Sequence, residues 1–289
     1  MAARYGPPVF RIMGVVNVTP DSFSDGGAFL DRDAAIAHGL RLAFEGADLL
    51  DVGGESTRPG ADPVSEDEER ARVIPVIEGI LAANRTVRIS IDTSKAAVAA
   101  AALDAGADYV NDVTALRGDP AMAALVADRG VDVCLMHMRG TPRSMQTEAR
   151  YDDVVADVKA FLAERIEAAV AAGIARERIE VDPGIGFAKD IGHNLELLRR
   201  LRELTELGRP LVLGTSRKTF LGRITGRETA ERMPATLATL VMAYERGAEV
   251  FRVHDVAAVA QALTVAGATL RGLWTGATTT STTSTRTTS

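Results

Sequence analysis

DLLDVGGESTRPGADPVSEDEERARVIPVIEGILAANRTVRISID, residues 48–92, contains the repeating unit on which the fold of this chain depends. A short aliphatic run ends at Val52, a glycine-rich polar loop follows, and an amphipathic segment leads to a second aliphatic run that ends at Asp92. Strands that alternate with helices in this way pair in parallel through right-handed crossovers. The stretch therefore predicts one β/α unit and the start of the next.

The same unit recurs along the whole chain. We expect strands at 9–16, 48–52, 87–91, 107–111, 131–136, 179–181, 210–213 and 248–253, and helices that include 33–45, 65–83, 152–172, 194–204 and 255–270. Glycines suited to left-handed helix ends follow several helical stretches, at Gly46, Gly106, Gly130, Gly173 and Gly247. An open doubly wound sheet is the alternative, but its usual G-x-G-x-x-G motif after the first strand is absent. We predict a single (β/α)₈ barrel, which typically takes about 250 residues.

Composition limits the classes of function. Of the 289 residues 46% are hydrophobic, and the net charge of −6 offers no general attraction for nucleic acid or a membrane surface. Cys134 is the only cysteine and lies in an apolar run, so we expect a buried, inert thiol. No secretion signal or membrane-spanning stretch is evident, which makes the cytoplasm the expected location. Residues 1–274 are predicted to form the barrel, and the Thr/Ser-rich residues 275–289 a disordered tail.

Polar residues follow every predicted strand. They are Asn17 with 19–27, Asp51 with 53–60, Asp92, Asn111 with Asp112, His137 with Arg139, 182–187, 216–218, and Arg252 with His254. Any one of them has an ordinary explanation as a turn or helix-cap residue. In a barrel, however, all eight strand ends open into one bowl, where such enzymes place their active sites. Eight coincident polar endings predict a functional site at this mouth.

The residue types divide that mouth into two parts. Asp92, Asn111 and Asp182 suit a flat ligand with several N–H donors, such as an amino-pyrimidinone ring, because carboxylates accept and an amide does both. Arg252 and His254 alternate at one strand end and are predicted to hold an anion, with Lys218 as a further charge. Asn17, together with a phosphate, makes Mg²⁺ plausible.

Several long motifs in order carry a resemblance to a known family. They are 13–27 (MGVVNVTPDSFSDGG), 51–60 (DVGGESTRPG), 90–93 (SIDT), 110–113 (VNDV), 136–140 (MHMRG), 182–187 (DPGIGF), 215–218 (TSRK) and 252–256 (RVHDV). Through them the chain resembles the dihydropteroate synthases, pterin-binding barrel enzymes of folate biosynthesis. The resemblance spans about Arg11 to Val256. It departs from the family pattern only at 190–191 and Thr219, and the length leaves no room for a second catalytic domain.

The resemblance implies an activity and a set of roles. Such enzymes join 6-hydroxymethyl-7,8-dihydropterin diphosphate to 4-aminobenzoate, giving 7,8-dihydropteroate and diphosphate. It assigns the pterin to Asp92, Asn111, Asp182 and Lys218, the diphosphate to Arg252, His254 and, through Mg²⁺, Asn17, and the aminobenzoate pocket, where sulfonamides also bind, to Phe23, Thr57, Arg58, Pro59, Phe187 and Ser216. It also implies a homodimer.

The chemistry expected at this site needs no protein nucleophile. Diphosphate departs as Arg252, His254 and Mg²⁺ meet its growing charge, and a carboxylate such as Asp25 stabilises the cationic pterin methylene. Lys218, Arg252, His254 and Asp25 are therefore the predicted catalytic residues. Three alternatives stay open: a methyltetrahydrofolate:corrinoid methyltransferase, a Schiff-base aldolase that uses Lys218, and a relative that has lost turnover.

Overall fold

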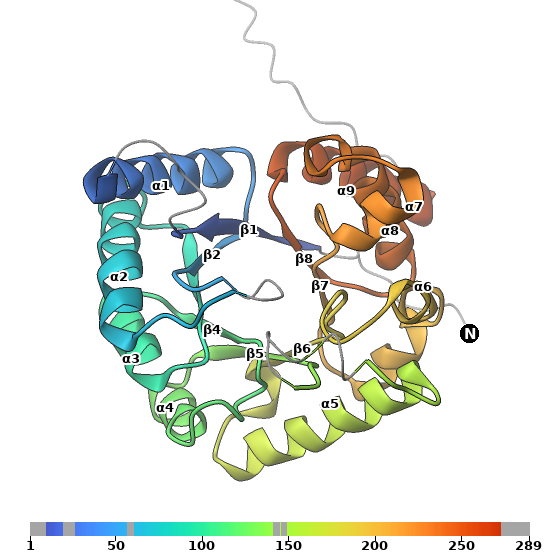
Figure 1. The fold of residues 1–289 in the computed structure, drawn as a ribbon, viewed down its shortest axis with the longest axis horizontal. Coiled ribbons are helices and arrows are strands. Elements are labelled where there is room, and N and C mark those ends of the chain that lie inside the picture. The colour runs from blue at the N-terminus through green and yellow to red at the C-terminus, as the bar shows by residue number, and fades with distance from the viewer. Residues whose placement is uncertain (1–9, 20–26, 57–60, 141–144, 146–148, 273–289) are drawn as a thin grey trace, which may run out of the picture.

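The computed structural model describes residues 10–19, 27–56, 61–140, 145 and 149–272 (Figure 1). The strands are β1 (Arg11–Asn17), β2 (Leu49–Gly53), β3 (Arg88–Asp92), β4 (Tyr109–Asp112), β5 (Asp132–Met136), β6 (Ile179–Asp182), β7 (Val212–Leu213) and β8 (Val250–Val253). The helices are α1 (Gly27–Phe44), α2 (Glu66–Ala83), α3 (Ala96–Asp104), α4 (Met122–Arg129), α5 (Val154–Ala171), α6 (Ile191–Arg199), α7 (Thr219–Thr225), α8 (Met233–Glu245) and α9 (Val256–Arg271). Three 3₁₀ helices join them in the described chain, η2 (Arg176–Arg178), η3 (Leu201–Leu207) and η4 (Thr229–Glu231).

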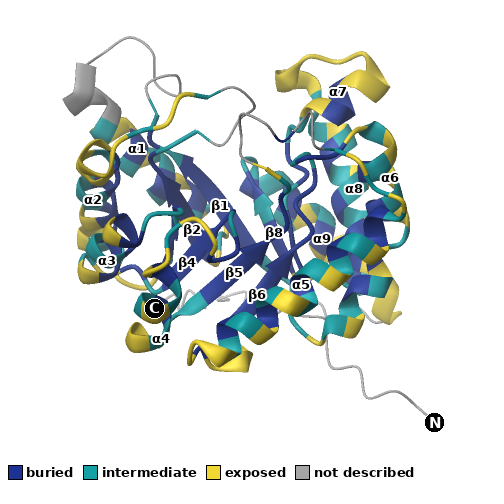
Figure 2. Cartoon of the chain, turned by 60° about the horizontal axis from the view of Figure 1, so that its bottom comes forward, coloured by how far each residue is buried: buried dark blue, intermediate teal, exposed yellow. Residues whose placement is uncertain are grey.

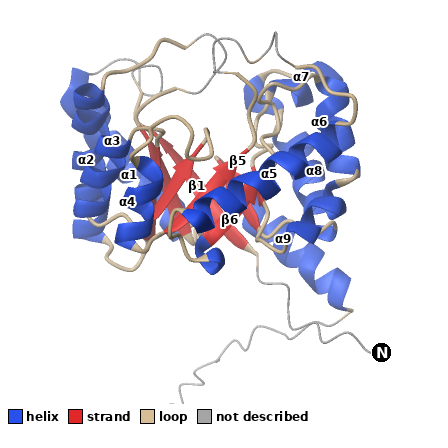
Figure 3. Ribbon diagram, turned by 90° about the horizontal axis from the view of Figure 1, so that it is seen from below, coloured by secondary structure: helices blue, strands red, loops and turns tan. Residues whose placement is uncertain are grey.

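The eight strands form one parallel sheet that curls into a barrel. Their order is β6-β5-β4-β3-β2-β1-β8-β7, and a parallel bridge between Val181 and Leu211 joins the two edges. The helices surround the strands as an outer ring (Figure 1), and the side view of Figure 3 shows them flanking the strands on both sides. The predicted α/β class and barrel architecture are confirmed.

Strand alternation divides the barrel into an outer core and an inner filling. Residues on the outward side, such as Ile89, Val110 and Leu135, pack in a large cluster with buried helix residues. The inward side carries a separate buried cluster of Met13, Leu49, Tyr109, Cys134, Val212 and Val250. Figure 2 shows buried strands inside helices whose outer faces are exposed. The inner apolar layer fills the barrel below its mouth, as is usual for this fold.

Local sequence signals begin and end the helices. Ser65 caps α2, its Oγ accepting from Glu68 N at 3.3 Å, and Asp153 caps α5 by accepting from Val155 N and Ala156 N. The five predicted helix-end glycines all have positive φ, between 60° and 108°. Within the described residues, no helix has the length and apolar character needed to cross a bilayer.

The predicted elements agree with the structure except in one region. All eight strands occur where expected, with ends that differ by a few residues. The continuous helix expected over 194–204 is wrong: α6 ends at Arg199, Arg200 leaves helical geometry, and the chain continues as η3. The buried leucines Leu197, Leu201 and Leu204 are spaced three and four residues apart, a spacing that suits both helix types. The tail at 275–289 lies outside the described residues, so the proposed division into a barrel and a tail remains a prediction.

Candidate active site

The inner face of the barrel becomes polar at the carboxyl ends of the strands. In the sheet register Asp51 of β2 lies opposite Ser90 of β3, and Asp92 lies opposite Asn111 of β4. Asp182 ends β6, and Arg252 lies one residue before the end of β8. Arg252 spans β1 to reach carboxylates on β2 and β3, which is possible only through the barrel interior. The predicted convergence of these strand ends is therefore present.

Asp51 is the centre of a buried hydrogen-bond network at the mouth. Its carboxylate is fully buried and accepts from Ser90 Oγ at 2.5 Å, Asn111 Nδ2 at 3.1 Å and Arg252 Nε at 2.6 Å. Arg252 Nη2 also donates to Asp92 Oδ2 at 2.7 Å. Because the Asn111 amide nitrogen faces Asp51, its carbonyl oxygen is the group left to accept from a ligand. The sequence places Asp51 among the polar strand ends of the mouth but predicts no role for it, and it does not single out Ser90.

Burial raises the proton affinity of the two carboxyl groups predicted to read a ligand edge. Desolvation, with repulsion from Asp51, raises the pKa of Asp92 to about 7, and Arg252 opposes that rise. Burial likewise raises the pKa of Asp182, while the 2.6 Å hydrogen bond from Gly184 N to its Oδ1 opposes it. Perturbed carboxyl groups in one concave region are typical of functional sites.

Lys218 lies directly before α7 and reaches toward the loop after β6. Its Nζ donates to Ile185 O at 2.5 Å and lies 4.3 Å from the centre of the Phe187 ring. Burial lowers the pKa of Lys218 to about 8, and the nearby Asp182 carboxylate opposes that shift. The structure thus brings Lys218 and Asp182, predicted for the pterin, close to Phe187, which is predicted for the aminobenzoate pocket.

Ser216 and His254 form a second polar pair at the mouth. Ser216 Oγ accepts from His254 N at 3.2 Å and lies 3.0 Å from His254 Nδ1. The next residue, Arg217, has a positive φ of 58° and forms a two-point ion pair with Asp255. Residues that are assigned by resemblance to two different substrates therefore touch each other here.

Left-handed backbone at residues other than glycine gathers in the loops of this mouth. Within the described chain such residues are Ala115, Leu116, Ala188 and Arg217. Ala115 and Leu116 follow β4, Ala188 follows β6 and Arg217 follows β7, on the side where the strands end. This conformation is unfavourable for residues with a Cβ, and it persists where surrounding contacts hold it, commonly at functional sites.

Asn17 is the last residue of β1 and lies opposite Gly53 in the register. Its side chain offers an amide oxygen, which suits Mg²⁺. In the described part of the chain, no group of three or more His, Cys, Asp or Glu residues is arranged to hold a metal ion.

Five predicted site residues fall outside the described chain. Phe23 and Asp25 belong to the segment after β1, and Thr57, Arg58 and Pro59 to the segment after Ser56. Their roles stay predictions.

Comparison with known proteins adds independent findings. Residues 13–254 match the family described as "Pterin binding enzyme". The dihydropteroate synthase of Escherichia coli K12 is 45% identical over 260 residues, which cover 90% of this chain and 92% of that protein. A Xanthomonas albilineans dihydropteroate synthase with bound 4-aminobenzoic acid is 52% identical, with a TM-score of 0.86 and coverage of 91% and 93%. The complex of the enzyme from that organism with 7,8-dihydropteroate is 49% identical, with a TM-score of 0.83 and coverage of 92% and 95%.

Proposed function

The chain belongs to the pterin-binding enzyme family as a dihydropteroate synthase, and we propose that its barrel mouth carries out this condensation through the residues described above. The reaction joins 6-hydroxymethyl-7,8-dihydropterin diphosphate to 4-aminobenzoate and releases diphosphate. One observation carries the assignment of residues: Asp92, Asn111 and Asp182 converge at one polar mouth beside the cationic groups of Lys218 and Arg252. A flat heterocycle that carries an anion matches that division.

The pterin edge is proposed to meet the inner carboxyl and amide groups. Asp92 and Asp182 accept from ring and exocyclic N–H groups, and Asn111 accepts through the oxygen that its contact with Asp51 leaves available. Buried acceptors left without partners are costly, so a ring that lacks these donors is rejected. The set therefore selects an amino-pyrimidinone ring over an apolar one of the same shape.

The diphosphate end is proposed to meet Arg252 and His254. Arg252 uses Nε and Nη2 on Asp51 and Asp92, which leaves other guanidinium N–H groups for phosphate oxygens. The paired carboxylates hold the guanidinium in a fixed orientation before substrate arrives. Donors that are fixed in advance do not have to reorganise as charge develops on the leaving group. This preorganisation is the main source of electrostatic stabilisation of a transition state.

The bond change follows from these positions. The C–O bond to diphosphate breaks with its electron pair on oxygen, the amine nitrogen of 4-aminobenzoate forms a C–N bond with its own lone pair, and that nitrogen then releases a proton. Lys218, whose Nζ lies beside the Phe187 ring, donates a hydrogen bond to an acceptor atom of the pterin ring in this proposal. Asp25 is our proposed partner for the cationic methylene. Exclusion of water protects that carbon until the amine arrives.

The aminobenzoate pocket is proposed to lie between Phe187 and Ser216. The Phe187 ring supplies an apolar face, and Ser216 with His254 supplies polar contacts. Phe23, Thr57, Arg58 and Pro59 complete the pocket in the proposal. Because sulfonamides share the shape of 4-aminobenzoate, we propose that they compete for the same place.

Magnesium is proposed as the metal cofactor, with Asn17 as its protein ligand. Mg²⁺ prefers oxygen and commonly binds through few protein groups and several substrate phosphates, which fits the lone amide at the end of β1. When bound, the ion would neutralise charge on the diphosphate.

A diphosphate-release assay tests the proposal. Release should require both 4-aminobenzoate and the pterin diphosphate, and it should fall when Mg²⁺ is chelated. Turnover without 4-aminobenzoate, or none with all components present, would contradict the proposal and favour a relative without this activity. Methyl transfer to a corrinoid would instead support the methyltransferase alternative, and borohydride trapping at Lys218 the aldolase.

A homodimer is the proposed assembly. The exposed outer faces of α8 and α9 lie side by side, and 236–244 and 256–270 contain no charged residue. Met242 and Val265 are exposed apolar residues on this surface. A charge-poor apolar face suits association with a second copy. Light scattering measures the oligomeric state, and a monomeric mass at assay concentration would contradict the proposed homodimer.

We also propose the cytoplasm as the location.

A further inference from the structure

Lys189, which the mechanism above does not use, has a deeply buried amine. The residue is 3% exposed, and Nζ lies 2.9 Å from both His137 Nδ1 and Phe187 O. Burial and the nearby Lys189 amine lower the pKa of His137 to about 2, and burial lowers the pKa of Lys189 well below its ordinary value. The contact therefore joins an imidazole, an amine and a carbonyl inside the protein. Burying an amine has a free-energy cost, so we expect this buried amine to make contacts that offset it.

The amine closes a turn that the backbone does not favour. Ala188, between Phe187 and Lys189, is buried with φ +50°. Tyr151 Oη donates to Ala188 O at 3.0 Å, while Gly186 N donates to Asn194 Oδ1 at 2.7 Å. Two side chains from other segments, together with Lys189 itself, thus bind backbone groups of three consecutive residues of this loop. Such convergence is what keeps a left-handed alanine in place.

The turn controls where the Phe187 ring lies. Phe187 N donates to Gly184 O at 3.0 Å, and the Lys189 amine holds Phe187 O, so both backbone groups of this residue are fixed. With its backbone fixed, the ring lies over Lys218 Nζ at 4.3 Å. Lys218 has its own anchor at Ile185 O, so loss of the Lys189 contact would move the ring more than the lysine.

We propose that Lys189 is a positioning residue for the aminobenzoate pocket, acting through Phe187. Its long side chain reaches from the turn to His137 on the neighbouring β5 loop and ties the two loops together. A methionine of similar length would fill the space but could not donate to Phe187 O. The inference rests on the proposed function, because it takes the Phe187 ring to face 4-aminobenzoate.

Steady-state kinetics of Lys189→Met test the inference. We expect KM for 4-aminobenzoate to rise about tenfold, while KM for the pterin diphosphate changes less than threefold. Lys159→Met is the matched control, since Lys159 is a partly exposed lysine on α5 that pairs with Glu206, and it should leave both constants unchanged. An equal change in both KM values would mean a general structural role and overturn the inference, as would no change in either.

A second readout does not depend on activity. The protein labelled with 4-fluorophenylalanine gives ¹⁹F signals, and Phe187→Leu assigns the Phe187 signal. In Lys189→Met that signal should shift or broaden while the others stay, even if the wild type shows no turnover and the proposed function fails. An unmoved signal would overturn the inference. If Lys189→Met does not fold, Tyr151→Phe removes one hydroxyl from the same turn and should raise KM for 4-aminobenzoate two- to threefold; an unchanged KM would overturn it.

Discussion

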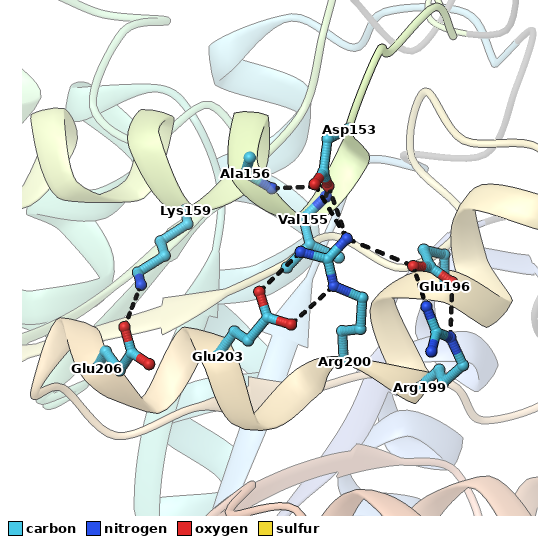
Figure 4. Close-up of polar contacts among 9 residues, drawn as sticks. All are labelled: Asp153, Val155, Ala156, Lys159, Glu196, Arg199, Arg200, Glu203 and Glu206. Atoms are coloured by element: carbon cyan, nitrogen blue, oxygen red, sulfur yellow. Dashed lines mark hydrogen bonds and ion pairs between the residues drawn. The ribbon is translucent and has the colours of Figure 1, made fainter.

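Two arginines in this protein each bridge several carboxylates, and their surroundings differ. Arg252 at the barrel mouth joins Asp51 and Asp92, and Arg200 between α6 and η3 joins Asp153, Glu196 and Glu203 (Figure 4). The two arginine side chains are almost equally exposed, at 24% and 26%. Their partners are not: Asp51 is 0% and Asp92 10% exposed, whereas the three acids around Arg200 are between 33% and 44% exposed.

The difference shows that the burial of the carboxylates determines how much such an arginine contributes to stability. If Arg200 is removed, water can solvate its acids, and exposed pairs of this kind contribute little. If one member of the Arg252 group is removed, a charge or hydrogen-bonding group remains buried without its partner, which is strongly destabilising. We therefore expect the mouth to depend on every member of its network and the outer cluster to depend on none. Four experiments can break or sharpen this comparison.

Asp51→Asn should have the largest effect. One oxygen of Asp51 accepts from Ser90 and the other accepts from Asn111 and Arg252, so an asparagine here can keep these contacts only in one orientation and in either orientation removes the negative charge that pairs with Arg252. We expect a loss of about 3 kcal/mol in unfolding free energy, in line with other broken buried pairs, and a fall in kcat/KM of at least about 100-fold as Arg252 and Asn111 lose their orientation. Urea unfolding and the diphosphate assay measure the two effects. Glu203→Gln in the outer cluster is the control, and equal effects from both substitutions would end the comparison.

Alanine substitution of two glycines, one in each region, compares the same two regions through the backbone. Gly184 in the β6 loop and Gly208 at the end of η3 have φ of 67° and 65°, so alanine meets the same intrinsic strain at both, roughly 1 kcal/mol. At Gly184 a Cβ would lie 2.0 Å from His137 O, whereas at Gly208 it meets nothing within 4 Å. We expect Gly184→Ala to lower stability by about 3 kcal/mol or more because the clash adds to the strain. Thermal or urea unfolding that ranked Gly208→Ala as the more damaging change would contradict this picture.

The same two regions show what sequence could and could not predict. The eight strands and five glycine helix ends followed from local patterns, because strand alternation and left-handed caps depend on near neighbours. The break at Arg200 did not follow, since leucines spaced three and four residues apart suit α and 3₁₀ helices alike. In the structure the side chain of Arg200 meets acids from α5, α6 and η3, a tertiary arrangement that periodicity does not show.

The sequence predicts which residues lie at the site, but it predicts only a part of the contacts between them. Strand ends in a barrel converge, so Asp92, Asn111, Asp182 and Arg252 could be placed together from their positions alone. The bond between Arg252 and Asp51 joins residues 201 positions apart and depends on how far neighbouring strands are staggered. The burial of Lys189 against His137 depends in the same way on two loops that meet only in the fold.

The third-largest expected effect is the pH dependence of pterin binding at the barrel mouth. Because the pKa of Asp92 is raised to about 7, the folded protein holds a proton there that an unfolded chain releases at the ordinary value, so stability falls as the pH rises from that ordinary value to about 7 and changes no further above it. Pterin binding through the ionised carboxylate should therefore be about tenfold weaker at pH 6 than at pH 8. Calorimetry with a pterin whose own ionisation lies outside this window measures the effect. Asp92→Asn should bind more weakly and show a flat profile; a slope that survives in the variant would assign the titration to another group.

Arg200→Met should have the smallest effect. The variant keeps an aliphatic side chain at the junction of α6 and η3 but loses the guanidinium that joins Asp153, Glu196 and Glu203. Asp153 still caps α5 through Val155 N and Ala156 N, so the helix start survives. The three acids are solvated, and their repulsion is screened at ordinary ionic strength. We expect unchanged kinetic constants and a urea midpoint within experimental error of the wild type at 0.15 M salt, with a small difference only at low salt. A clear loss of stability at high salt would mean that this cluster is coupled to the core, and that partner exposure is not what separates the two arginines.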